Sequence, residues 1–520
     1  MTEQEKPENS EPEDEIEESF WFRFQEDAHR KMPFVVHSPY EKGLLKLHQE
    51  RDPEENKDTC PPGDEQIQLH CLWAAEFYTP MHAEDLASAF VTLGWNKDDD
   101  LNSSSSPATW VERFRTGSYA GGWSNLGILR DTNSRSLMLG PGQKVKLPEN
   151  VEYATGHMFS HSSSITCVVI GFVFEEEYGL KYEHALRENY KTHHTPLRRG
   201  WAIISPELQK RNRIAELREE TRVQAKNWFT LNMPGAFCGA DKSNKHFPTC
   251  EFITLKNTEP FPGIGDERDR QGWLHVLEMD HDWNTWKSEK MDGLKFSWPV
   301  LRDEKNNFHA VLSASHRSLE KLDVKIYEGD NRSGYVGFLN NKISELLSRW
   351  ACLSLIRIHE ERLFRIRDSK NYKASNRKTL QFLKKIQDLV SESLDISTLT
   401  QELIRFSKEK LHFRWDGDTF RPSRTYGEKE PISLTEALSS RIESRSNSLL
   451  ELDRSLKELI IQQGNLLSAS ENIKLQRWMR WLTSIMTILT IAMAYGVLKD
   501  TNISSSQIWS FISSWALTLF

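Results

Sequence analysis

The sequence predicts an α+β cytoplasmic domain, followed by a long helical stalk and a C-terminal transmembrane helical hairpin. Three observations lead there: strand-like and helix-like segments in irregular succession over the first 335 residues, a proline-free heptad pattern after residue 431, and an uncharged run at 481–498. The chain has 520 residues, 38% of them hydrophobic, and 17 tryptophans. This composition is typical of globular proteins, and the length predicts more than one domain.

The first large segment, residues 20–335, predicts the α+β domain. Runs of β-branched and aromatic residues predict strands at 68–77, 163–174, 250–255, 273–279, 294–300 and 308–315. Helices are expected at 84–93, 206–229 and 336–367, the second with Ser205 as N-cap and Pro206 in its first turn. Because strands and helices do not alternate regularly, we favour an α+β arrangement over a doubly wound sheet.

The charge of the chain is concentrated at its beginning. Residues 1–19 hold nine acids and one lysine, a net charge of −8, so we expect a disordered acidic tail. The rest of the chain then has 66 basic and 66 acidic residues, from totals of 67 and 75. This balance gives no field that would draw the protein to nucleic acid. The six cysteines form no C-x-x-C pair, as expected of thiols in a reducing cytoplasm.

A stalk helix is predicted at 431–480. Ser433-Leu-Thr-Glu436 is a capping box, and no proline follows it before the uncharged run. Apolar residues fall in heptad register at Ile442, Leu449, Leu452, Leu456, Leu459, Leu466 and Ile473. Three polar residues, Arg445, Gln463 and Ser470, occupy core positions of the same register and weaken it. Such a stripe packs against another helix, so we expect a homo-oligomer through the stalk.

The end of the chain predicts a membrane hairpin. Residues 481–498 would be the first transmembrane helix, and 501–520 a second transmembrane helix or a re-entrant segment in contact with lipid. Lys474, Arg477 and Arg480 precede the first span, whereas only Lys499 and Asp500 follow it. The positive-inside rule then places the N-terminal domain in the cytoplasm, at a plasma or inner membrane.

Two charged groups are candidate binding sites. The helical basic connector, 336–430, includes an anion-patch candidate whose members are Arg362, Arg365, Arg367, Lys370, Arg377 and Lys378. A solvated helical face is the alternative. In the expected strand around 273–279 and just beyond it, alternation would place Glu278, Asp280 and Asp282 on one side, where their oxygens would hold a divalent cation. Ordinary packing or a solvated turn is the alternative here too. No other cofactor is indicated.

The C-terminal third resembles the CorA-type magnesium transporters. Met479-Arg480 followed by Leu482-Thr483, and later Tyr495-Gly496, is similar to that family's succession at the two ends of its first membrane helix. Val497 and Leu498 stand where the family's Gly-Met-Asn signature would continue. The resemblance implies an oligomeric cation channel or transporter with a stalk that continues into the membrane.

Two functions from different classes follow from these patterns. In a channel, Thr483, Thr487 and Thr490 would line the pore, and Asn502 would stand in for the missing asparagine. Packing between helices is the alternative role of these threonines. The second hypothesis is a membrane-tethered cytoplasmic sensing or binding module with no pore. No nucleophile with an identifiable base occurs in the sequence, so nothing specific predicts an enzyme.

Overall fold

The computed structural model describes residues 20–32, 39–95, 111, 122–132, 143–197, 200–240, 246–263, 271–298, 308–320, 331–368, 396–409, 419–424 and 431–500, with five residues beyond (506, 509, 510, 513 and 514). The chain divides into two compact units. The first comprises Met1–Glu360 and Thr398–Leu449, and the second Glu361–Ser397 and Leu450–Phe520.

A mixed sheet of ten described strands forms the centre of the first unit. Their order across the sheet is β12 (Phe420–Pro422), β9 (Thr285–Ser288), β10 (Lys295–Ser297), β11 (His309–Ser315), β8 (Thr249–Leu255), β1 (Ile67–Tyr78), β5 (Thr166–Phe174), β4 (Val151–Ser160), β2 (Gly122–Asp131) and β3 (Gln143–Val145). The pairs β8/β11 and β2/β3 are parallel, and the other neighbours are antiparallel. A separate hairpin pairs β6 (His193–Leu197) with β7 (Gly200–Ile204).

The described helices vary widely in length. They are α1 (Phe20–Lys31), α2 (Pro39–Asp58), the 3-10 turn η1 (Pro80–His82), α3 (Ala83–Thr92), α5 (Glu176–Gly179), α6 (Lys181–Arg187), α7 (Pro206–Asn232), α8 (Ala236–Ala240), α9 (Gly272–Val276), α10 (His316–Leu319), α11 (Asn331–Asp368) and α13 (Leu434–Asp500). Ser205 caps α7 as expected, its hydroxyl accepting from the Leu208 amide. The capping box of α13 also forms, with Ser433 and Glu436 bonding each other's amides.

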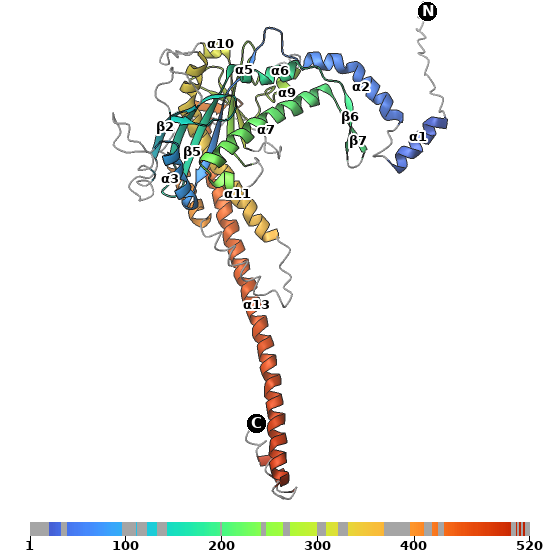
Figure 1. The fold of residues 1–520 in the computed structure, drawn as a ribbon, viewed down its shortest axis with the longest axis vertical. Helices are drawn as coiled ribbons and strands as arrows, with labels where there is room; N and C mark the ends of the chain where they lie inside the picture. Colours follow the sequence, from blue (N-terminus) through green and yellow to red (C-terminus); the bar gives the residue numbers. More distant parts are fainter. Residues whose placement is uncertain are drawn as a thin grey trace, which may run out of the picture. The chain divides into compact units, whose positions relative to one another are not determined.

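The long helices α7 and α11 cover opposite faces of the sheet (Figure 1). Phe172 of β5 packs edge-on against Trp228 and Phe229 of α7. On the other face, the indole of Trp73 donates to the Asn340 side chain of α11 over 2.8 Å. Both central strands, β1 and β5, are buried along their whole length because each is covered on two faces.

Most of the strong strand predictions are confirmed, and one is wrong. The runs at 68–77, 250–255 and 308–315 form β1, β8 and β11, and the run at 163–174 contains β5. The predicted strand at 273–279 is instead the short helix α9, which ends in a turn at Glu278. Only 295–297 of the strand expected at 294–300 pairs, as β10.

The predicted fold class is wrong in its transmembrane hairpin. Among the described residues, none of the helices combines the length and the apolar character that a membrane crossing requires. Residues 481–498 are the continuation of α13, with no break at the expected boundary. Threonine and serine interrupt the apolar residues of this run, and their hydroxyls bond the helix's own carbonyls. Most of 501–520 lies outside the described residues.

The predicted heptad register of α13 is right in one of its two rows and wrong in the other. Ile442, Leu449 and Leu456 are buried as predicted, but the second buried row is Ser446 and Asp453, one residue after the predicted Arg445 and Leu452. Arg445, assigned to a core position by the sequence, is instead half-exposed and pairs with Glu360. Leu459, the next predicted core position, is exposed. The helix therefore buries one stripe up to Leu456, and at the described positions Leu459 and Ile473 the predicted register is exposed.

We predict that Gly171→Ala destabilises the first unit. A methyl group at Gly171 would come within 2.8 Å of the Trp73 indole, and Trp73 is fully buried and held by Asn340. Overpacking of this kind costs about 1–3 kcal/mol. Urea denaturation should show a lower midpoint for this variant. Gly63→Ala is the matched control, since no atom lies within 4 Å of the added group; equal midpoints for the two variants would contradict this packing.

Candidate functional site

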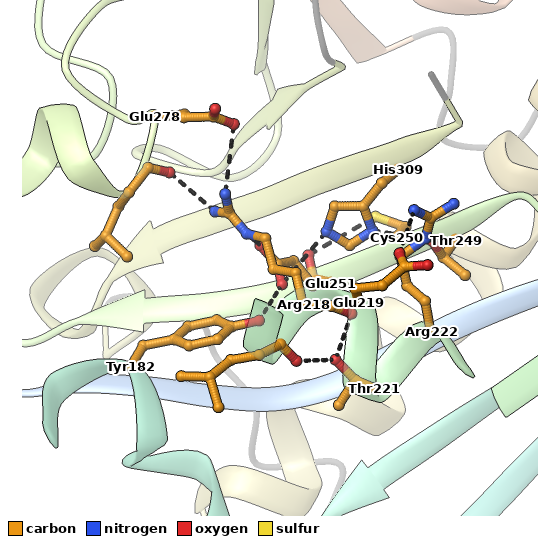
Figure 2. A network of polar contacts seen from close by, with 12 residues as sticks. Tyr182, Arg218, Glu219, Thr221, Arg222, Thr249, Cys250, Glu251, Glu278 and His309 are labelled. Atoms are coloured by element: carbon orange, nitrogen blue, oxygen red, sulfur yellow. Dashed lines mark hydrogen bonds and ion pairs between the residues drawn. The ribbon is translucent and has the colours of Figure 1, made fainter. Parts of the chain in front are cut away.

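A network of charged and polar side chains is buried between α7 and the sheet (Figure 2). Its centre is Glu251 of β8, which is 1% exposed. Arg218 of α7 donates to one carboxylate oxygen over 2.8 Å, and the Tyr182 hydroxyl of α6 donates to the other over 2.7 Å. One glutamate thus joins three separate elements.

His309 of β11 completes the surroundings of Glu251. Its Nε2 lies 3.4 Å from a Glu251 oxygen, near enough for attraction but long for a strong hydrogen bond. Its Nδ1 is 2.9 Å from the Thr249 hydroxyl, which also accepts from Arg222. Burial lowers the pKa of His309, and the attraction of Glu251 only partly opposes this.

Glu251 is ionised although it is fully buried. Burial by itself would raise the pKa of this carboxyl group, but attraction to Arg218 and His309 outweighs the burial and lowers the pKa to about 2. Arg218 also donates to the Leu277 carbonyl and lies 3.4 Å from Glu278. Each partner of the central ion pair thus has at least one further polar partner, and the Glu251 carboxylate has no proton to exchange at neutral pH.

Lys181 lies beside this network and interacts electrostatically with Glu251. Its ammonium donates to the Tyr178 hydroxyl and to the Leu217 carbonyl, and stands 4.3 Å from the centre of the Tyr178 ring. Burial lowers its pKa to about 7, with partial opposition from Glu251 and Glu220. A substantial fraction of the amine is therefore neutral and nucleophilic at neutral pH.

A second buried carboxylate, Glu76 of β1, holds the segment around α8. Its oxygens accept from the amides of Phe77, Phe237 and Cys238 over 2.7–2.9 Å. Burial raises the pKa of Glu76 to about 7, although these hydrogen bonds favour the ionised form. The backbone before α8 lies close to Glu76, since a side chain at Gly235 would collide with this carboxylate.

The predicted acidic metal site does not form. Glu278 has a left-handed backbone, with φ +59°, and pairs with Arg211 and Arg218. Asp280 accepts from His275 and His281, and Asp282 pairs with Arg424. The three acids face different partners because the segment is a helix and turn, which lacks the alternation of a strand. In the described part of the chain, no cluster of three or more possible ligands can hold a metal ion.

The other predicted site residues fall on two helices. Arg362, Arg365 and Arg367 lie in the last turns of α11, where Arg365 is 4.0 Å from Glu361, whereas Lys370, Arg377 and Lys378 lie outside the described residues. On α13, Thr483, Thr487 and Thr490 each donate to a carbonyl of the preceding turn over 2.8 Å. Asn502 also lies outside the described residues.

The five residues of the family resemblance all lie on the exposed part of α13: Met479, Leu482, Thr483, Tyr495 and Gly496. Comparison of the chain with protein-family models, curated proteins and solved structures finds no match. The resemblance to the CorA-type transporters therefore rests on these short motifs alone and stays a prediction.

Apolar side chains continue along α13 after its burial ends. From Leu459 to Tyr495, thirteen large apolar residues besides Leu459 are strongly exposed: Ile461, Ile473, Leu475, Trp478, Met479, Trp481, Leu482, Met486, Ile488, Leu489, Ile491, Met493 and Tyr495. Their exposed fractions lie between 44 and 66%. An apolar surface of this extent is a mark of an interaction site. We call residues 459–495 the exposed segment of α13.

Sequence reasoning missed the network around Glu251. One signal was present: Glu251 is the one acid in the otherwise apolar or hydroxyl-bearing strand Thr249–Leu255. A charge in such a strand requires a buried partner. The identity of that partner, Arg218, depends on how α7 crosses the sheet, and periodicity along the chain does not reveal it.

We predict that Glu251→Gln lowers the free energy of unfolding by about 3–5 kcal/mol, because it leaves Arg218 buried without its main counter-charge. Glu278→Gln removes the weaker, 40% exposed partner of the same arginine and should cost less than about 1 kcal/mol. Denaturant unfolding at pH 7 measures both. Similar losses for the two variants would contradict a central role for Glu251.

We also predict that Glu76 makes stability fall as pH rises. The folded chain keeps the Glu76 proton up to about pH 7, whereas the unfolded chain releases it near the ordinary value of 4.5. The folded state therefore binds more protons in this window, and the free energy of unfolding decreases as pH rises from about 4.5 to 7, by up to about 3 kcal/mol. Glu76→Gln should flatten this dependence between pH 5 and 8. An unchanged slope would show that another group causes it.

Proposed function

We propose that this protein is an assembly protein, in which the exposed segment of α13 associates with another helix and so brings copies of the mixed-sheet domain together. The observation that carries the proposal is the change along one continuous helix. Up to Leu456, most of the apolar residues of α13 are buried; beyond it, residues as apolar are exposed to water.

The energetics support association. Each large apolar side chain that leaves water contributes roughly 1.5–3 kcal/mol. A helix of 67 residues is about 100 Å long, so the exposed segment offers several turns of contact to a second helix. Helices of this kind gain most of their stability from packing of an apolar face and little from intrinsic propensity.

The exposed segment is also the part of α13 that carries few charges. Between Leu459 and Tyr495 the charged residues are Glu471, Lys474, Arg477 and Arg480, all within three turns, and none follows Arg480 in this segment. The self-association of the segment therefore has little charge repulsion to overcome. The proposal also accounts for three features that the sequence predicts at this end of the chain: a helical stalk, an uncharged run and a homo-oligomer.

We predict that the full-length protein is oligomeric and that Leu482→Asp with Leu489→Asp makes it monomeric, because buried charges at a helix interface are strongly unfavourable. Light scattering coupled to size-exclusion chromatography gives the masses. The control is Val223→Asp with Leu231→Asp, which adds the same charge to exposed apolar positions of α7. A monomeric parent protein, or equal dissociation by the two double variants, would overturn the proposal.

A further inference from the structure

The exposed segment of α13 contains a second heptad register, different from the one that the domain buries. Leucine recurs every seven residues at 475, 482 and 489, and methionine every seven residues at 479, 486 and 493. Together they form a stripe with alternating steps of four and three residues, the spacing of the a and d positions of a coiled coil. All six side chains are at least 46% exposed. We call this set the Leu/Met stripe, with methionine at a and leucine at d.

The same register continues toward the N-terminus with asparagine. Ile461 occupies a d position, and Asn465 and Asn472 occupy successive a positions; all three are exposed. The sequence places Ser468 at the d position between them. Asparagine at a costs stability but fixes register and number of strands in parallel coiled coils. The core positions of this register are therefore apolar toward the C-terminal end. Toward the N-terminal end, the asparagine side chains fix the register and the number of strands.

Two other faces of this helix are less suited to pairing. The face with Trp478, Trp481, Ile485 and Ile488 continues upstream through Lys474 and Glu471. The face predicted from the sequence, through Leu459 and Ile473, continues downstream through Arg477 and Arg480. Each would place charged side chains at core positions. Only the Leu/Met stripe, among these three, runs from 461 to 493 without a charge in its core.

The flanking charges are compatible with two copies in parallel. In the Leu/Met register, Lys474, Arg477 and Arg480 fall at the outer positions c, f and b. Glu471 falls at g, which in a parallel pair faces Gln476 at e of the other copy. No like charges then meet across the seam, whereas basic residues in contact would repel.

The polar positions favour the same orientation. In a parallel pair in register, Asn465 and Asn472 each meet their own copy, and two amide side chains can hydrogen-bond each other. In an antiparallel pair, the asparagine end of one helix would meet the Leu/Met end of the other and leave buried amides unsatisfied. We propose that the partner of the exposed segment is a second copy of this chain, paired in parallel and in register along residues 461–493. This inference rests on the proposed assembly function.

Disulfide cross-linking of the full-length chain tests this geometry. Leu482→Cys places thiols face to face across the seam of a parallel dimer, and a disulfide requires Cβ atoms about 4 Å apart. Ile488→Cys is the matched control, because position c faces away from the seam. Cys60→Ser and Cys238→Ser form the background for both variants, since these two native cysteines are partly exposed and the other four are buried.

We expect Leu482→Cys to cross-link at least about tenfold more than Ile488→Cys under mild oxidation, since only the former satisfies disulfide geometry. A mixture of Asn465→Cys and Leu489→Cys chains should form no mixed disulfide; its formation would show an antiparallel pair, in which an a position meets a d position of the other helix. Asn472→Leu should add species heavier than a dimer, because the register loses an amide that specifies two strands. A chain that associates without Leu482→Cys cross-linking overturns this geometry alone, whereas a monomeric parent overturns the assembly function itself.

Discussion

The ionised carboxylate of Glu251 is the constraint on which the first unit depends. A charge at the centre of a sheet is tolerable only if cationic and hydroxyl donors reach it, and here they come from α7 and α6, with the imidazole of β11 beside them. The pair Arg218–Glu251 therefore fixes where α7 crosses the sheet. The same crossing brings Trp228 and Phe229 onto Phe172, so the apolar contacts follow from the polar one.

The helix α13 shows a second constraint. An apolar surface that the protein's own chain does not cover needs another molecule to cover it. The first part of the helix meets the requirement within the fold, through the buried stripe that ends at Leu456. Its later part changes both register and environment. The Leu/Met stripe lies in a different heptad register and is exposed, so a partner helix must cover it.

Much of the sheet could be predicted from the sequence, because β1, β5, β8 and β11 are dense in apolar, β-branched or aromatic residues. The strands β2 and β4 were not predicted, since both contain glycine and several polar residues that their neighbours in the sheet tolerate. At α9 the error is the reverse, a predicted strand where a helix forms. Its apolar residues predict a strand, but a five-residue helix buries them equally well. Short apolar runs do not distinguish these two outcomes.

The candidate sites were harder to predict because each depends on contacts between distant segments. Glu251 meets an arginine 33 residues away, and Glu278, expected to bind a cation, is turned toward the same arginine. The membrane prediction failed for a different reason. Eighteen residues without a charge predict a span, but the run also contains hydroxyl-bearing residues, and the described helix does not reach the apolar character of a membrane span.

Hydrogen–deuterium exchange along α13 tests the account most directly, in the parent protein and in the Leu482→Asp, Leu489→Asp variant. Residues 434–456 should be protected in both, because the fold itself buries this part of the helix. Residues 461–493 should be protected in the parent protein and exchange rapidly in the variant. Equal exchange of 461–493 in the two proteins would contradict the claim that a second helix covers this segment.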